Sequence, residues 1–134
     1  MPIKPETSYP AVLGSVLARQ RKQRGWDQKT LAERLEVSIS TWSRIENGES
    51  NLSIPQLQKV ADILSAKGAT ITSQDILEET DRAVKALEKE GVVVHPEHKP
   101  EGWGTAAKWA GLAILSAAAL GGFLAALSID EKDK

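Results

Sequence analysis

The stretch that decides the fold is DQKTLAERLEVSISTWSRIENG, which covers residues 27–48 of the 134-residue chain. Asp27 and Ser38 each stand directly before an apolar periodic run, and both residue types cap helix N-termini. We therefore expect one helix to begin after Asp27 and a second to run over 39–47, with Gly48 ending it. The few residues between the two helices force a sharp crossing, which is typical of a helix-turn-helix unit.

Further helices are expected on both sides of this stretch. One begins near Pro10 and ends at Gly25, and another follows Ser53 and closes at Gly68. A fifth helix over 73–90 has one apolar and one charged side, so it either packs on the preceding helices or pairs with a second copy of the chain. The three valines at 92–94 can form a short strand, and a linker with two prolines follows them.

A C-terminal stretch at 109–129 contains 21 residues without a charge. A helix of that length spans about 31 Å, against a hydrocarbon core of about 30 Å. Trp103 precedes it in the manner of an interfacial aromatic, and Lys99 and Lys108 predict a cytoplasmic N-terminal side. The large apolar residues of the expected span are Trp109, Leu112, Ile114, Leu115, Leu120, Phe123, Leu124, Leu127 and Ile129.

These patterns predict an all-α protein in three parts. They are a compact helix-turn-helix domain of four to five helices at 1–68, an amphipathic helix and linker at 69–101, and a transmembrane helix with a short charged tail at 102–134. Ten Lys and Arg face seven Asp and Glu in residues 1–69, so the head is basic, whereas residues 70–101 are acidic. We expect the protein at the cytoplasmic side of a bacterial inner membrane, the alternative being a cytoplasmic protein whose last helix is used for self-association.

The head resembles the lambda repressor and Cro-like helix-turn-helix family, also called the XRE family, over about residues 13–64. The matching residues keep the family's order and spacing, and they are Leu13-Gly14, Arg21, Gly25, Gln28, Leu31-Ala32, Val37-Ser38, Thr41, Ile45-Glu46, Gly48, Ser53 and Val60-Ala61. The resemblance implies binding to double-stranded DNA, commonly as a dimer on two half-sites. It also implies an ion pair between Arg21 and Glu46.

The segment 39–47 is the expected base-reading helix, because each base pair presents a distinct pattern of donors and acceptors in the major groove. Trp42 and Ile45 carry its apolar side. The outward residues are therefore Ile39, Ser40, Ser43 and Arg44. Arg44 is the strongest base reader among them, because a guanidinium can bind guanine through two hydrogen bonds.

Other residues are expected at the DNA backbone. By resemblance, Gln28 binds a phosphate or braces a base contact from the N-terminus of its helix, and Asn47 contacts the backbone. Lys29 and Thr30 are further candidates for backbone contacts.

Two positions depart from the family's pattern. Glu36 stands in the turn where the family usually has glycine, so it needs a positive φ or a reshaped turn, and it places a negative charge near DNA. Gln20 replaces an apolar residue of the first helix, which predicts looser packing there.

The function that these observations favour is sequence-specific transcriptional regulation, by repression, from a membrane-anchored protein. A homodimer or higher oligomer is expected to form through the helix at 73–90, through the small-residue face of the C-terminal helix, or both. The alternatives are a membrane-associated scaffold that docks proteins through the helix-turn-helix, and an autorepressing antitoxin. We expect no metal, because two histidines in a linker without cysteine are usually solvated. We expect no enzyme activity or cofactor, because the sequence has no recognisable carboxylate pair, Ser-His-Asp set or Gly-rich phosphate loop.

Overall fold

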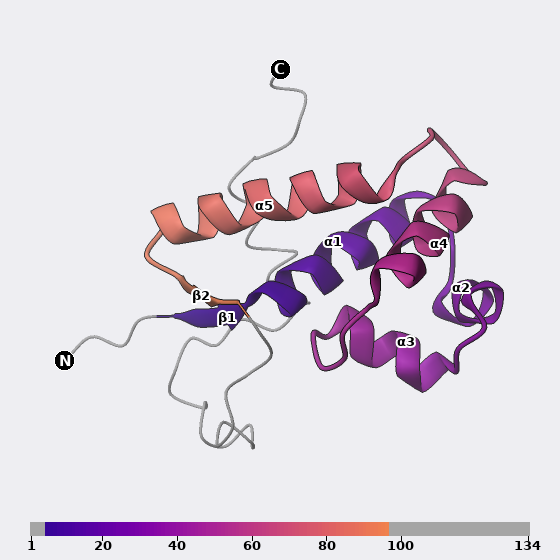
Figure 1. The fold of residues 1–134 in the computed structure, drawn as a ribbon, viewed down its shortest axis with the longest axis horizontal. Helices are drawn as coiled ribbons and strands as arrows, with labels where there is room; N and C mark the ends of the chain where they lie inside the picture. The colour runs from indigo at the N-terminus through magenta and orange to yellow at the C-terminus, as the bar shows by residue number, and fades with distance from the viewer. Residues whose placement is uncertain (1–4, 97–134) are drawn as a thin grey trace.

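The computed structural model describes residues 5–96, in which five helices and two short strands follow one another along the chain (Figure 1). Their bounds are β1 Glu6–Ser8, α1 Tyr9–Gln23, α2 Gln28–Leu35, α3 Ile39–Glu46, α4 Ile54–Ser65, α5 Ser73–Lys89 and β2 Val93–His95. The five helices expected before residue 97 are all present. Four of the five end earlier than their patterns suggested: α1 ends at Gln23, α3 at Glu46, α4 at Ser65 and α5 at Lys89.

Each helix begins at a polar residue whose side chain accepts a hydrogen bond from the backbone of the first turn. This contact satisfies an N–H that has no partner inside the helix. The caps are Ser8, Asp27, Ser38, Ser53 and Thr72, in chain order. Local chemistry thus sets the start of all five helices, and three of these caps, Asp27, Ser38 and Ser53, were predicted.

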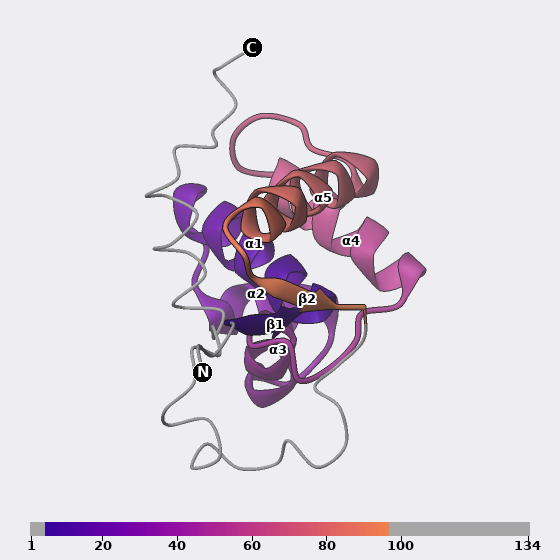
Figure 2. The ribbon, with the colours of Figure 1, turned by 90° about the vertical axis from the view of Figure 1, so that its left-hand side faces the viewer.

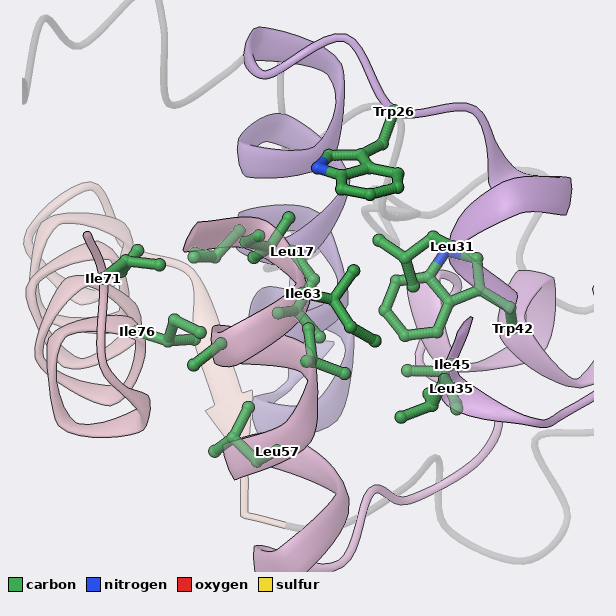
Figure 3. Close-up of a cluster of buried hydrophobic side chains, with 14 of the residues drawn as sticks. Leu17, Trp26, Leu31, Leu35, Trp42, Ile45, Leu57, Ile63, Ile71 and Ile76 are labelled. Carbon is green, nitrogen blue, oxygen red and sulfur yellow. The ribbon is translucent and has the colours of Figure 1, made fainter. Parts of the chain in front are cut away.

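The main core lies where α1, α2, α3 and α4 meet, with α5 closing one side (Figure 3). Trp42 of α3 is fully buried, as are Leu17, Leu31 and Leu64 from the three neighbouring helices. A second cluster joins the start of α1 to the end of α5 and β2, and Leu87 lies within it. Because one set of side chains packs against several helices, the orientation of α3 depends on the whole domain.

Helix α5 packs along α1, on the opposite side from α3 (Figure 1). Its buried residues are Ile76, Thr80, Ala83 and Leu87, so the apolar side that could have paired with a second copy is used within the chain. Gln20 donates to Glu79 over 3.1 Å, and Arg19 pairs with the same carboxylate. Gln20 thus makes a polar contact between α1 and α5, and the looser packing expected at this position stays a prediction.

The two strands form a small parallel sheet, so the described part of the fold is mostly helical but not all-α (Figure 2). Glu6 is paired with Val93 and Ser8 with His95. The His95 ring also lies 2.9 Å from the Glu6 carboxylate. The beginning of the chain is thereby joined to the segment that leads into residues 97–134.

Within residues 5–96, no helix has both the length and the apolar character needed to cross a membrane. The predicted span at 109–129, from Trp109 to Ile129, lies outside the described residues. The same holds for the small-residue face that was expected to pair two C-terminal helices.

Candidate nucleic-acid interface

Helices α2 and α3 are joined by a turn that has the hydrogen bonds of a Schellman motif. The N–H of Val37 donates to the carbonyl of Ala32 over 3.0 Å, and that of Glu36 donates to Glu33 over 3.1 Å. Glu36 adopts φ 69° and ψ 39°, the left-handed conformation expected if the turn keeps the family's shape. A residue with a Cβ is strained there by about 1–2 kcal/mol, so the surrounding packing sets this turn against its local preference.

The inner side of α3 is fixed closely against α1. Trp42, Ile45 and Glu46 are buried on it. Gly14 of α1 lies opposite the end of α3, and a Cβ at this position would stand 2.3 Å from the carbonyl oxygen of Glu46. Only glycine allows this approach of the two backbones, which determines how far α3 projects from the domain.

A buried carboxylate holds the inner side of α3 to α1 and α2. Glu46 accepts 2.6 Å hydrogen bonds from Arg21 Nε and from the indole N–H of Trp42. Gln28 donates to it over 2.8 Å, and Arg21 Nη2 adds a fourth contact at 3.2 Å. The structure thus contains the expected Arg21–Glu46 ion pair, with Arg21 and Glu46 only 8% and 5% exposed. Hydrogen bonds to ionised groups are the stronger kind, so this cluster fixes three helices together.

The outer side of α3 carries the four residues predicted to read bases. Ser40 and Arg44 are exposed, Ser43 is half-buried, and Ile39 is 45% exposed although it is a large apolar residue. An α-helix with its side chains is about 10–12 Å across, which matches a major groove about 12 Å wide. The structure therefore gathers all four predicted residues on one accessible surface.

Arg44 differs from the arginines in α1 and at its C-cap because its guanidinium has no partner among the described residues. Arg19 pairs with Glu79, and Arg21 pairs with Glu46. Arg24 donates to the carbonyls of Leu64, Lys67 and Ala69, which closes the end of α4. The charge of Arg44 is consequently available to a ligand that lies against α3.

The hydroxyls of Ser38 and Ser40 at the start of α3 already take part in hydrogen bonds within the domain, unlike the guanidinium of Arg44. Ser38 accepts from the backbone N–H of Thr41 at 3.0 Å, and its hydroxyl lies 3.2 Å from that of Ser40. Ser40 can still contact a base or a phosphate, since a hydroxyl both donates and accepts. The first turn of α3 thus enters any complex with its polar groups already positioned.

The residues predicted at the DNA backbone lie at two places. Lys29 is exposed and Thr30 half-buried in the first turn of α2, and Asn47 is exposed at the C-cap of α3. The Gln28 side chain instead turns inward to Glu46. In this structure it braces α2 against α3, and a phosphate contact by its amide remains a prediction.

The N-terminus of α2 carries a negative charge of its own. Asp27 accepts from the backbone N–H of Thr30 over 2.7 Å, and this hydrogen bond lowers the pKa of the carboxyl below its usual 3.8. The side chain is therefore ionised at neutral pH. A phosphate near α2 must lie beside the cap and not on it, which favours contact through the exposed Lys29.

Three residues donate hydrogen bonds to Glu46, and two of them, Trp42 and Gln28, were not predicted from the sequence. One signal was available, because Trp42 and Glu46 stand four residues apart and so share a helix face. The contact of Gln28 with Glu46 could not be predicted from neighbouring residues, since the two residues are 18 apart and lie on different helices.

A sharply joined helix pair whose second helix has an accessible polar side defines the fold as a helix-turn-helix. The family described as "Helix-turn-helix domain" matches residues 12–73. The crystal structure of the clp gene regulator ClgR from Corynebacterium glutamicum is similar at 30% identity, with a TM-score of 0.54 over 64% of this chain and 88% of the other. No curated protein is similar enough to count as a match. The chain belongs to the helix-turn-helix family of DNA-binding proteins, and the XRE class is compatible with it.

Proposed function

We propose that the protein is a sequence-specific transcriptional regulator that represses genes by placing α3 in the major groove of its operator. The single observation that carries the proposal is the guanidinium of Arg44, unpaired within residues 5–96, on the accessible side of a rigidly held helix. A guanidinium in this place can donate to O6 and N7 of one guanine. The proposed action is binding alone, and it involves no catalytic step.

Two further observations support this function. The similar protein ClgR is a regulator of clp genes. The inner side of α3 is fixed by Glu46 and Gly14, so its outer side meets DNA with little loss of conformational freedom. Repression follows physically if an occupied operator overlaps a promoter, because the bound domain excludes other proteins from that groove.

The test is a gel-shift experiment with the full-length chain on a duplex selected from a random pool and on an unrelated duplex. We expect tighter binding to the selected duplex, with both affinities falling as salt rises because phosphate contacts release counterions. If neither duplex is bound at low salt, the proposal fails and the helix-turn-helix serves to dock proteins.

The proposal extends to the cell membrane through the C-terminal segment. The uncharged stretch 109–129 is long enough to anchor the protein, with the DNA-binding domain in the cytoplasm and the lipid bilayer as a second partner. Pairing of two such helices would supply the second domain that paired half-sites require.

Membrane association is tested by sedimentation. Full-length protein should pellet with membranes and resist carbonate extraction, whereas a chain ended at residue 101 should stay in the supernatant. Carbonate extraction of the full-length protein would rule out the anchor and would leave the DNA-binding proposal untouched.

A further inference from the structure

An apolar groove of about 230 Å³ lies where the start of α1, the start of α4, α5 and the end of β2 meet. Figure 2 shows the end of β2 beside the connection between α3 and α4. The groove is distinct from the outer side of α3. Its lining includes Tyr9, Leu13, Leu52, Ile54, Leu77 and Pro96.

The groove presents apolar surface that the described part of the chain leaves uncovered. Ile54 is 63% exposed, and the only other large exposed apolar residue among residues 5–96 is Ile39 on the proposed DNA-reading side. Tyr9 forms a fixed wall, because its hydroxyl donates to Asp81 over 3.0 Å. An apolar hollow with an exposed isoleucine in its lining suits an apolar side chain as its ligand.

The size of the groove restricts its ligand. Sites for drug-sized molecules occupy about 300–1,000 Å³, so this groove is small for a metabolite. An apolar cavity of about 150 Å³ holds benzene, so about 230 Å³ suits a larger aromatic group such as an indole ring.

The chain itself continues from the edge of the groove, because Pro96 both lines it and precedes residues 97–134. The next six residues are Glu97, His98, Lys99, Pro100, Glu101 and Gly102, which offer little to an apolar hollow. Trp103 follows, flanked by glycines. Seven residues reach about 23–25 Å when extended, so Trp103 can return to the groove.

We propose that the groove binds the indole of Trp103 from the same chain. A ligand attached by so short a connection has a high effective concentration, so even one buried side chain can occupy the site. Occupation would hold the start of the C-terminal segment beside the connection between α3 and α4. The DNA-reading helix would then keep a fixed orientation relative to that segment, whether or not DNA is bound.

The absence of cysteine from the chain permits a direct test by disulfide cross-linking. One cysteine replaces Asn51 at the groove (Asn51→Cys) and the other replaces Gly104 beside Trp103 (Gly104→Cys), both in the full-length protein. The protein is oxidised mildly in the membrane fraction or the supernatant, whichever contains it after sedimentation. A disulfide requires Cα atoms within about 4.4–6.8 Å. We expect the bond to form within one chain, at least about tenfold faster than in a control that pairs Gly104→Cys with Ser40→Cys on α3.

A third variant shows whether the indole causes the proximity. Adding Trp103→Ala to the Asn51→Cys, Gly104→Cys chain should reduce the rate to that of the Ser40→Cys control. Equal rates in all three chains would overturn the proposal, as would a rate unaffected by Trp103→Ala. Disulfides between chains would also overturn it, because a second copy would then occupy the groove. DNA is absent throughout, so the result is independent of the DNA-binding proposal.

Discussion

The inner and outer sides of α3 differ in what surrounds their charged residues. On the inner side, the Glu46 carboxylate is buried and accepts hydrogen bonds from Arg21, Gln28 and Trp42. On the outer side, Arg44 is exposed and has no partner among the described residues. The same eight-residue helix therefore carries one charge that the fold uses and one that it leaves available.

This difference separates stability from recognition. A buried charge that loses its partner is costly, whereas an exposed arginine contributes little to folding. Substitutions on the inner side should therefore unfold the domain, and those on the outer side should change DNA binding alone. Four substitutions test this division between residues that stabilise the fold and residues that bind DNA.

The largest effect is expected from Glu46→Gln. The substitution leaves the buried Arg21 without a counter-charge, and breaking a buried pair in this way costs about 3–5 kcal/mol. Chemical denaturation followed by circular dichroism measures the loss of unfolding free energy. The matched control is Glu49→Gln on the exposed surface just after α3, which should change stability by less than about 0.5 kcal/mol. Equal effects of the two substitutions would show that the inner cluster is not structural.

Arg44→Ala should weaken binding to a selected duplex by about 1–3 kcal/mol without lowering stability. The control is Arg82→Ala, which removes the same charge from an exposed position on α5, across α1 from α3 (Figure 1). Fluorescence anisotropy on selected and unrelated duplexes separates base reading from general attraction. If Arg44→Ala weakens both duplexes equally, its charge contacts phosphate and not a base.

Glu36→Gly should raise stability by about 1 kcal/mol, because glycine adopts the left-handed conformation without the strain of a Cβ. The side chains of Glu36 and Lys59 form an ion pair at 3.6 Å, but both are exposed, so losing this pair changes the unfolding free energy little. The substitution also removes a negative charge near the proposed interface and should strengthen DNA binding at low salt. A lower melting temperature would show that the turn does not store strain.

The smallest effect is expected at low pH from the cap of α2. The pKa of Asp27 is lowered by its hydrogen bond with Thr30, so the cap stabilises the fold above the unfolded value of about 3.8. That contribution is lost as the pH falls through the lower pKa of the folded state. Asp27→Asn keeps a cap that does not titrate, so its stability relative to the original chain should rise in this acid range. A constant difference between pH 6 and pH 2 would contradict the role given to Asp27.

The sequence predicted those parts of the fold that depend on local chemistry. Asp27, Ser38 and Ser53 could be assigned as caps because the hydrogen bonds that make a cap lie within one helical turn. The buried and exposed sides of α3 followed from the spacing of Trp42 and Ile45. The four predicted base-reading residues consequently lie together in the structure.

Features that join distant segments could not be predicted in this way. The parallel pairing of β1 with β2 links Glu6 to Val93 through two three-residue strands, which are too short to show periodicity. The side chain of Gln28 is exposed or inward depending on where α3 lies, which α1 determines through Gly14. Such contacts are set by tertiary packing and leave little trace in the neighbouring sequence.

The central claim is that the outer side of α3 reads bases through Arg44. Selection of bound duplexes from a random pool, performed in parallel with the original chain and with Arg44→Ala, tests it most directly. The account predicts a motif containing a guanine whose preference disappears in the variant, while the preferences at the other positions remain. An unchanged motif, or the absence of any motif from the original chain, would contradict it.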